Sequence, residues 1–286
     1  VKATNTYSGT GGLHQVYLGL GWSPFKGFAI GVNAAYLWGD YSRSVINSYT
    51  DAYANTLSKY YTAEVHNYKL DFGMQYTQKI TKNDAITLGV TYGLGHKLSS
   101  DPKCQIISTN AQTAVADTAT YSIGNGLELP HSYGVGLMWN HANRWRVGAD
   151  YTLQKWSSVA YPKFDTSTNS YELVSGQFAD RHKMTVGGEF CPDERSRSFF
   201  KRVHYRMGAS YATDYLKIKG QNGPKEYSVS AGFGIPIVNG YNNRSLLNIS
   251  AQWVRQDSKT FVTENSFRIN IGLTFNERWF AKWKME

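Results

Sequence analysis

Apolar and polar residues alternate one by one in eleven separate segments of the chain. Strict alternation is typical of β-strands that present one apolar face, because successive side chains of a strand point to opposite faces. The apolar phases run from Val16 to Trp22, Phe28 to Trp38, Tyr68 to Tyr76, Ile86 to Leu94, Tyr133 to Trp139, Trp145 to Leu153, Met184 to Phe190, Val203 to Tyr211, Tyr227 to Ile235, Leu247 to Trp253 and Phe267 to Phe275. We therefore predict an all-β protein with one antiparallel domain over residues 1–286.

The residues between the apolar positions distinguish a membrane barrel from a soluble sandwich or soluble barrel. They are mostly small or polar, and nine are charged or titratable: Lys69, Asp71, Arg146, Asp150, Lys183, Glu189, His204, Arg206 and Arg268. In a soluble sandwich these positions would face open water, where small side chains have no advantage. In a membrane barrel they face a crowded polar lumen, where glycine makes room and opposite charges pair. Aromatic residues near the segment ends, such as Trp22 and Tyr133, fit the belts at the two membrane surfaces.

Helical membrane proteins are excluded by the lack of long apolar runs. No stretch approaches the ~18 consecutive apolar residues that a spanning helix needs. A barrel strand needs an apolar residue only at every second position, so a hydrophobic content of 41% is sufficient. We interpret the chain as an antiparallel transmembrane β-barrel of the bacterial outer-membrane type, in contact with outer-membrane lipid.

The lengths of the connections between segments give an independent indication. Outer-membrane barrels have short periplasmic turns and long extracellular loops. The connections after the first, third, fifth and ninth segments are short, and the one after the seventh is intermediate. Those after the second, fourth and sixth are long, over residues 39–63, 99–129 and 157–181. By this alternation the first and last segments both run toward the periplasm.

The odd number of segments leads to an expectation about closure. Bacterial barrels of this type use an even number of antiparallel strands, and open edges in lipid would leave backbone N–H and C=O groups unpaired. We therefore expect one or three further strands upstream of residue 1, and three would give fourteen. We also expect that residues 14–22 and 267–275 do not pair with each other.

Charge and cysteine content argue against two other classes of protein. The net charge is +9, but the Lys and Arg residues are scattered with no run of five. This distribution argues against a nucleic-acid partner and fits a surface beside anionic lipid. Two cysteines are too few for a disulfide scaffold. Cys104 falls in a long loop and Cys191 beside a short turn, at opposite membrane surfaces, so we expect no bond between them.

The sequence indicates no catalytic, metal or cofactor site. His131 and Ser132 are adjacent, yet nothing places an Asp with them in the geometry that nucleophilic catalysis requires, so we predict that the protein is not an enzyme. No His, Cys and carboxylate residues have metal-ligand spacing. The nine lumen-phase residues remain as functional candidates. They either contact a substrate or, as the cost of unpaired buried charge favours, form a paired network that holds the interior.

Two segments resemble the FadL family of outer-membrane transporters. One is the hairpin of Leu129–Leu137 and Trp145–Thr152 with Trp156, and the other is the ending Phe267–Phe275 with the tail Asn276–Phe280, which is similar to FadL-like proteins of Bacteroides. The resemblance implies fourteen strands and transport of long-chain fatty acids and other hydrophobic compounds. It also implies an N-terminal hatch that plugs the lumen and an early kinked strand that opens sideways, both of which would precede residue 1.

The function implied by this resemblance is passive uptake of hydrophobic small molecules across the bacterial outer membrane. Cargo would be captured from the extracellular side, enter an occluded lumen and leave sideways into the bilayer. Two alternatives stay open. One is a polar-solute porin, which the charged lumen phase favours. The other is a non-transporting scaffold or secretion barrel, whose partners would be other envelope proteins.

Overall fold

The computed structural model describes residues 2–51, 53–218, 220–238, 244–258 and 262–274. Eleven antiparallel strands follow one another in chain order across one sheet. They are β1 (Ala3–Phe25), β2 (Phe28–Tyr49), β3 (Thr56–Lys79), β4 (Asp84–Gly93), β9 (Ser132–His141), β10 (Trp145–Gln154), β13 (Arg181–Phe190), β14 (His204–Ala212), β17 (Lys225–Val238), β18 (Arg244–Asp257) and β19 (Glu264–Thr274). The expectation of eleven sheet-forming segments is confirmed.

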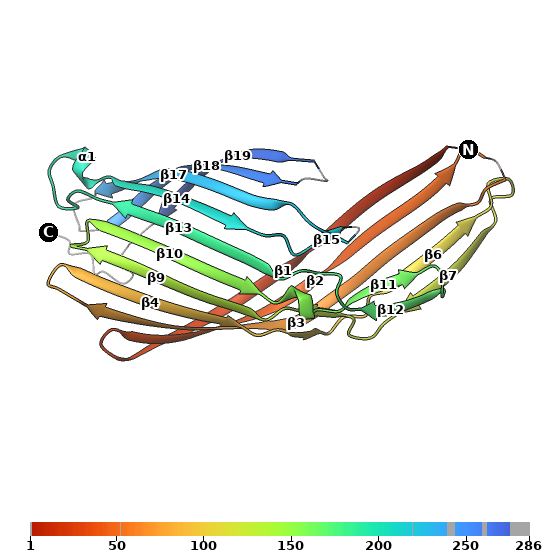
Figure 1. Ribbon diagram of the computed structural model, residues 1–286, viewed down its shortest axis with the longest axis horizontal. Coiled ribbons are helices and arrows are strands. Elements are labelled where there is room, and N and C mark those ends of the chain that lie inside the picture. The colour runs from red at the N-terminus through yellow and green to blue at the C-terminus, as the bar shows by residue number, and fades with distance from the viewer. Residues whose placement is uncertain (1, 52, 219, 239–243, 259–261, 275–286) are drawn as a thin grey trace, which may run out of the picture.

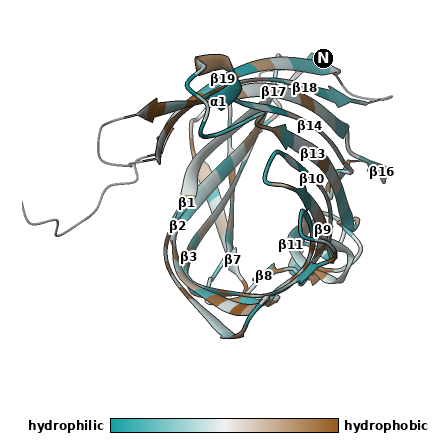
Figure 2. Ribbon diagram, turned by 90° about the vertical axis from the view of Figure 1, so that its left-hand side faces the viewer, coloured by the Kyte–Doolittle hydropathy of each residue, from teal (hydrophilic) through white to brown (hydrophobic). Residues whose placement is uncertain are grey.

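The sheet curls into an incomplete ring, as the end view in Figure 2 shows. β1 and β19 stand at the two ends of the strand order, and within the described residues neither pairs with the other. This agrees with the expectation for residues 14–22 and 267–275, of which residue 275 lies outside the described part. Two short helices, η1 (Trp156–Ser158) and α1 (Phe199–Arg202), lie in the connections.

No helix within the described residues is long and apolar enough to cross a membrane.

The apolar phase points away from the inside of the ring and is exposed on strand after strand. Leu18 is 71% exposed, Met207 74% and Ile271 72%. Soluble proteins rarely leave apolar surface of this extent in water, because burying such surface is the dominant favourable term in folding. In a barrel wall this surface contacts the hydrocarbon of the bilayer. We call it the outer face, and the opposite side of the sheet the inner face.

Three predicted long loops contain β-structure, and the first of them is mostly strand. β2 runs on to Tyr49 and β3 begins at Thr56, so most of the predicted loop over residues 39–63 is paired. β1 likewise begins at Ala3, well before its apolar phase. In these extensions the sequence no longer alternates apolar with polar residues, so the pattern gave no strand signal. A strand in water needs no apolar face on its solvated side, which explains why the ladder continues without one.

The strand extensions and the other two long connections form a cap at one end of the barrel. β6 (Lys103–Thr109) pairs with the outer part of β3, and β7 (Ala116–Ser122) pairs with β6. Two hairpins, β5 (His96–Leu98) with β8 (Leu127–Leu129) and β11 (Tyr161–Asp165) with β12 (Ser170–Val174), complete it. Figure 1 shows β6, β7, β11 and β12 together at this end, which we call the long-loop end. A small hairpin of β15 (Lys217–Ile218) and β16 (Gln221–Asn222) follows β14.

Side chains in the cap are packed as in a protein core. Val65 is 1% exposed and Cys104 is fully buried. The ammonium of Lys59 lies 5.3 Å from the ring centroid of Phe164, which belongs to β11. Burial raises the pKa of the Cys104 thiol and raises that of Tyr61 to about 12. The hairpin β11–β12 is therefore fixed against the extended sheet, and the cap is an ordered body.

Two glycines permit β1 and β2 to depart from regular strand geometry where the barrel passes into the cap. Gly11 has φ +108° and Gly39 has φ +145°. A Cβ atom would lie 2.3 Å from the carbonyl oxygen of Asp40 at the first position and 2.2 Å from that of Gly12 at the second. Only glycine fits both the dihedral angles and the close backbone approach.

Replacing two neighbouring residues of β4 by arginine, one at a time, should show different stability costs on the two faces. Leu88 is 47% exposed on the outer face, whereas a side chain added at Gly89 meets open space on the inner face. We expect Leu88→Arg to destabilise the barrel by ~2–4 kcal/mol near the bilayer midplane and Gly89→Arg by about 1 kcal/mol or less. Denaturant titration in lipid vesicles measures both changes. Equal costs would contradict the assignment of the faces.

Cys104 and Cys191 are both free and buried. Cys104 lies in the cap and Cys191 directly after β13, at the opposite end of the strands. A hydrocarbon core of ~30 Å separates the two levels, whereas a disulfide needs Cα atoms within ~7 Å. We expect reduction to leave the migration of the folded protein on a gel unchanged. A mapped Cys104–Cys191 peptide would show the topology to be wrong.

Candidate functional site on the inner face

The nine candidate residues from the sequence all stand on the inner face. Eight of them occupy a position between two outward-pointing residues of their strand, and His204, the first residue of β14, shares the phase of Arg206, since alternate residues of a strand point to opposite sides. They come from five strands: β3, β10, β13, β14 and β19. The register of the sheet brings some of them into contact and keeps others apart.

Glu189 of β13 is the centre of the largest group. Arg146 Nη1 donates to Glu189 Oε1 at 3.1 Å, and Arg206 Nε donates to Glu189 Oε2 at 2.7 Å. His204 Nδ1 lies 3.1 Å from the same Oε1. Arg206 Nη1 also donates to Oδ1 of Asn248 at 2.6 Å, so the group spans β10 to β18. We call these five residues the Glu189 cluster.

Cross-strand register builds this cluster. Arg146 is the direct partner of Glu189 across β10 and β13, and Glu189 is the direct partner of Arg206 across β13 and β14. The side chain of Glu189 is 16% exposed, against 40% and 39% for the two arginines. Two guanidinium groups beside one carboxylate leave excess positive charge on the inner face, and their remaining N–H groups are available as donors. The cluster lies at the end of the barrel that carries the short turns.

Lys69 and Asp71 form a separate ion pair within β3. In the part of the chain that the structure describes, Asp150, Lys183 and Arg268 have no ion pair. Arg146 thus takes its carboxylate from the next strand, not from Asp150 on its own strand. Six of the nine candidates are paired as a structural network requires, and direct contact of any of them with cargo stays a prediction.

Inner-face glycines make room for side chains of the neighbouring strands. Oδ1 of Asp150 lies 2.2 Å from the place where a Cβ of Gly136 would be. Oγ1 of Thr91 lies 2.3 Å from the corresponding place at Gly134. Polar side chains therefore lie flat across the backbone of the next strand instead of projecting inward. This arrangement widens the inside of the barrel and keeps its wall polar.

A cavity with a mixed lining adjoins the Glu189 cluster. Its volume is about 320 Å³, and its lining combines the polar side chains of Arg206, Ser230, Asn248, Gln252 and Asn270 with apolar ones such as Met207, Phe233 and Ile249. The polar groups offer hydroxyls, amides and one guanidinium to a polar solute. No three His, Cys, Asp or Glu side chains among the described residues gather closely enough to hold a metal ion.

His131, which the sequence places beside Ser132, has a structural role. Its Nδ1 accepts a hydrogen bond from the N–H of Gly95 at 3.2 Å and lies 2.8 Å from the hydroxyl of Tyr92. Its carbonyl oxygen accepts from the N–H of Lys155 at 2.9 Å. The ring therefore joins the connection after β4 to the start of β9.

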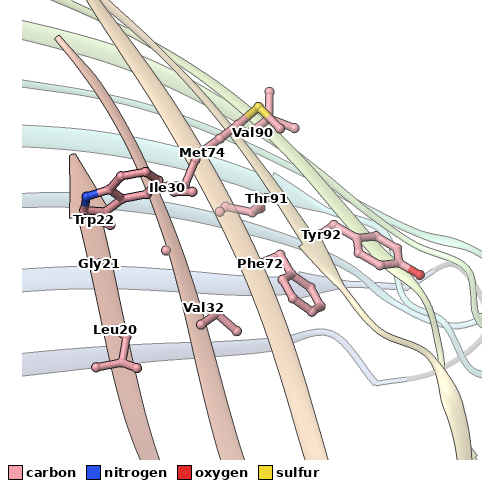
Figure 3. Close-up of a pocket in the computed structure, with 12 residues that line it drawn as sticks. Leu20, Gly21, Trp22, Ile30, Val32, Phe72, Met74, Val90, Thr91 and Tyr92 are labelled. Atoms are coloured by element: carbon pink, nitrogen blue, oxygen red, sulfur yellow. The ribbon is translucent and has the colours of Figure 1, made fainter. Parts of the chain in front are cut away.

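The outer face carries a shallow apolar groove beside the edge strand β1. Figure 3 shows its side chains, which come from β1 to β4. Leu20, Trp22, Val32, Phe72 and Met74 are among those that line a volume of about 440 Å³. Because these side chains belong to the lipid-facing phase, the groove is a surface on which an acyl chain or another apolar molecule can lie.

Solved structures with the same architecture include a hydrocarbon channel, a toluene transporter and a FadL homologue. The structure of the CymD monoaromatic hydrocarbon channel matches with a TM-score of 0.66 and 12% sequence identity, over 98% of this chain and 78% of CymD. The toluene transporter TbuX of Ralstonia pickettii matches with a TM-score of 0.60 and 13% identity, over 95% of this chain and 68% of TbuX. A FadL homologue of Pseudomonas aeruginosa matches with a TM-score of 0.53 and 14% identity, over 87% of this chain and 60% of that protein.

These likenesses confirm the FadL-like barrel fold that the hairpin around Pro130 and the C-terminal strand indicated. The Bacteroides origin stays a prediction. No curated protein sequence matches the chain. A family model described as BamG matches residues 1–286 of this chain. The chain therefore belongs to the BamG family.

Proposed function

We propose that the protein is a barrel of the bacterial outer membrane through which hydrophobic small molecules pass without an energy source. The FadL-like fold supports this proposal, since the solved structures that share it include a monoaromatic hydrocarbon channel and a toluene transporter. The lipid-facing outer face supports the location, with the short turns toward the periplasm and the cap outside the cell.

The chemistry of the two faces favours a sideways exit into the bilayer. An apolar molecule that moved straight along the inside would meet the Glu189 cluster and, beside it, the guanidinium and amide side chains of Arg206 and Asn248 at the short-turn end. Displacing water from charged and amide groups without replacing its hydrogen bonds is costly. The groove that includes Leu20 and Trp22 instead offers apolar surface on the lipid side of β1. Long-chain fatty acids are the finer form of the proposal and rest on the FadL resemblance.

Polar-solute transport is the second candidate, and the inner face favours it. The excess positive charge of Arg146 and Arg206 over Glu189 fits a pore that prefers anions. A scaffold or secretion barrel with envelope partners is the third, favoured by the cap, whose packing around Val65 and Cys104 gives the long-loop end a defined surface. The three candidates differ in what the protein does when no partner is present.

Transport by the full-length protein separates the candidates. In liposomes that contain the protein in its complete natural form, we expect faster entry of labelled toluene or oleate than in empty liposomes. In planar bilayers we expect no steady conductance, because a FadL-like lumen is occluded. An open pore with anion selectivity would support the porin instead. If the protein gives no conductance and no cargo entry, and other envelope proteins co-purify with it in a fixed stoichiometry, the scaffold would be supported.

Replacing Glu189 tests the role of the ion pairs independently of cargo. Glu189→Gln keeps the size of the side chain but leaves two guanidinium groups without their carboxylate. We expect a loss of about 1–3 kcal/mol in unfolding free energy, between the values for exposed and buried pairs. The control Asp71→Asn, in the more exposed pair with Lys69, should cost less than about 1 kcal/mol. Unfolding by urea in lipid vesicles measures both, and unchanged stability of the Glu189 variant would contradict a structural network.

A further inference from the structure

Five of the seven histidines lie on the outer face near the long-loop end of the strands. They are His14, His66, His96, His131 and His182. His14, His66 and His182 share the phase of the apolar residues of their strands, so their rings point to the lipid side of the wall. His96 and His131 lie in the connection between β4 and β9, and their contacts with Tyr68 and Tyr92 place them on the same side. Lipid-facing positions rarely carry titratable residues, because a polar group without partners is costly in hydrocarbon. Their gathering at one end of the barrel therefore needs a physical explanation.

The register places His14 and His182 at one height on the barrel, while His66, in the transverse row of His14 but two strands further on, lies about two residues nearer the cap. His182 shares its transverse row with Leu20 of β1, through Leu153, Tyr133, Tyr92, Phe72 and Val32. His14 lies six residues from Leu20 toward the long-loop end. Neighbouring strands lie about 4.8 Å apart and are tilted by about 35–45° from the barrel axis. A line of constant height around the barrel therefore moves along the chain by about 1–1.4 residues from each strand to the next. Six steps separate β1 from β13, so the offset of six residues is the one that a level ring requires.

Every histidine of this ring contacts an aromatic side chain of the same face. His14 stacks on Trp38 with ring centroids 5.8 Å apart, and His96 stacks on Tyr68 at 4.3 Å. The hydroxyl of Tyr36 lies 3.5 Å from His66, that of Tyr92 lies 2.8 Å from His131, and that of Tyr151 lies 2.7 Å from His182. Tyr and Trp concentrate at membrane–water interfaces, so the ring marks the membrane surface at the long-loop end.

Three of the five histidines keep ring nitrogens for an outside partner. At His131 and His182 the bond with tyrosine uses Nδ1, and no hydrogen bond within the described residues uses Nε2. His14 has a stacking contact but no hydrogen bond there. At His131, Nδ1 must accept, because it also receives the N–H of Gly95, so Nε2 carries the proton and donates outward. The other two have internal partners: His66 bonds Glu64, and His96 Nε2 lies 3.4 Å from Asn67 Oδ1.

We propose that this histidine–aromatic ring binds the phosphate groups of membrane lipids at the long-loop end. Imidazole N–H groups directed outward at the level of the head groups match the acceptor oxygens of phosphate, and such bonds to an anion are stronger than neutral ones. The net charge of +9 adds favourable electrostatics. The inference rests on the place of the barrel in the membrane and not on its cargo.

The test uses two double variants that separate the acceptor at Nδ1 of the imidazole from the outward donor at Nε2. Asparagine places its oxygen near the position of Nδ1, so His131→Asn with His182→Asn keeps an acceptor for the tyrosines and removes the outward donor. Glutamine reaches the position of Nε2, so His131→Gln with His182→Gln keeps the outward donor. His14→Phe keeps the stacking on Trp38 and removes both nitrogens. His141→Asn is the control, since His141 lies at the short-turn end and faces Asp84 at 2.8 Å.

Binding of dioctanoyl phosphatidate to the full-length protein in maltoside detergent is measured by native mass spectrometry, with dioctanoylglycerol as the probe without phosphate. We expect wild type to prefer phosphatidate and the Asn pair to weaken that binding by about tenfold or more. The Gln pair and His141→Asn should stay near wild type, and His14→Phe should lose part of the binding. Equal affinity for the two probes in wild type would overturn the proposal. Binding of phosphatidate by the Asn pair as tight as that by wild type would also overturn it. If the Asn pair fails to fold, binding by His14→Phe as tight as that by wild type would overturn it.

Discussion

Backbone hydrogen bonding in lipid is the constraint on which this structure depends. Hydrocarbon offers no partner to an N–H or C=O group, so each strand must find its partners on the strands beside it. Nine of the eleven strands satisfy this requirement on both sides by pairing in chain order, each antiparallel to the last, and β1 and β19 satisfy it on one side within the described residues. Because alternate residues then point to opposite sides, the same ladder sorts the chain into an apolar wall toward lipid and a polar wall toward the inside.

The polar wall brings a second constraint, since a buried charge without a partner is costly. Glu189 meets it by accepting hydrogen bonds from Arg146 and Arg206 on the two strands that flank it. Glycines such as Gly136 let neighbouring polar side chains lie flat, so the inside stays both wide and hydrophilic. A hydrophobic cargo is therefore better accommodated by the lipid-facing groove at Leu20 and Trp22 than by the short-turn end of the lumen.

At the membrane surface water becomes available to the backbone, and the alternation of apolar and polar residues ends there. The ring of histidine–aromatic pairs marks the level of the change, and beyond it β1, β2 and β3 continue without an apolar phase. Water on the solvated side allows these extensions to keep their ladder with polar residues. The cap then gains its own core around Val65 and Cys104, because here, as in a soluble protein, apolar side chains can be buried only against each other.

The sequence by itself determined the eleven strands of this chain and the face of each residue in their alternating segments, because a period of two is a local property, and the lengths of the connections indicated how the strands are directed. The sequence therefore placed Leu88 outward and Glu189 inward without any knowledge of neighbours. Only the tertiary structure decided which residues meet across strands. Glu189 binds Arg146, which lies 43 positions away, and Tyr151 meets His182, 31 positions away. Such partners depend on register and on the folding of connections with no repeating pattern. For the same reason the cap could not be read as strands, since its stability comes from packing between distant segments.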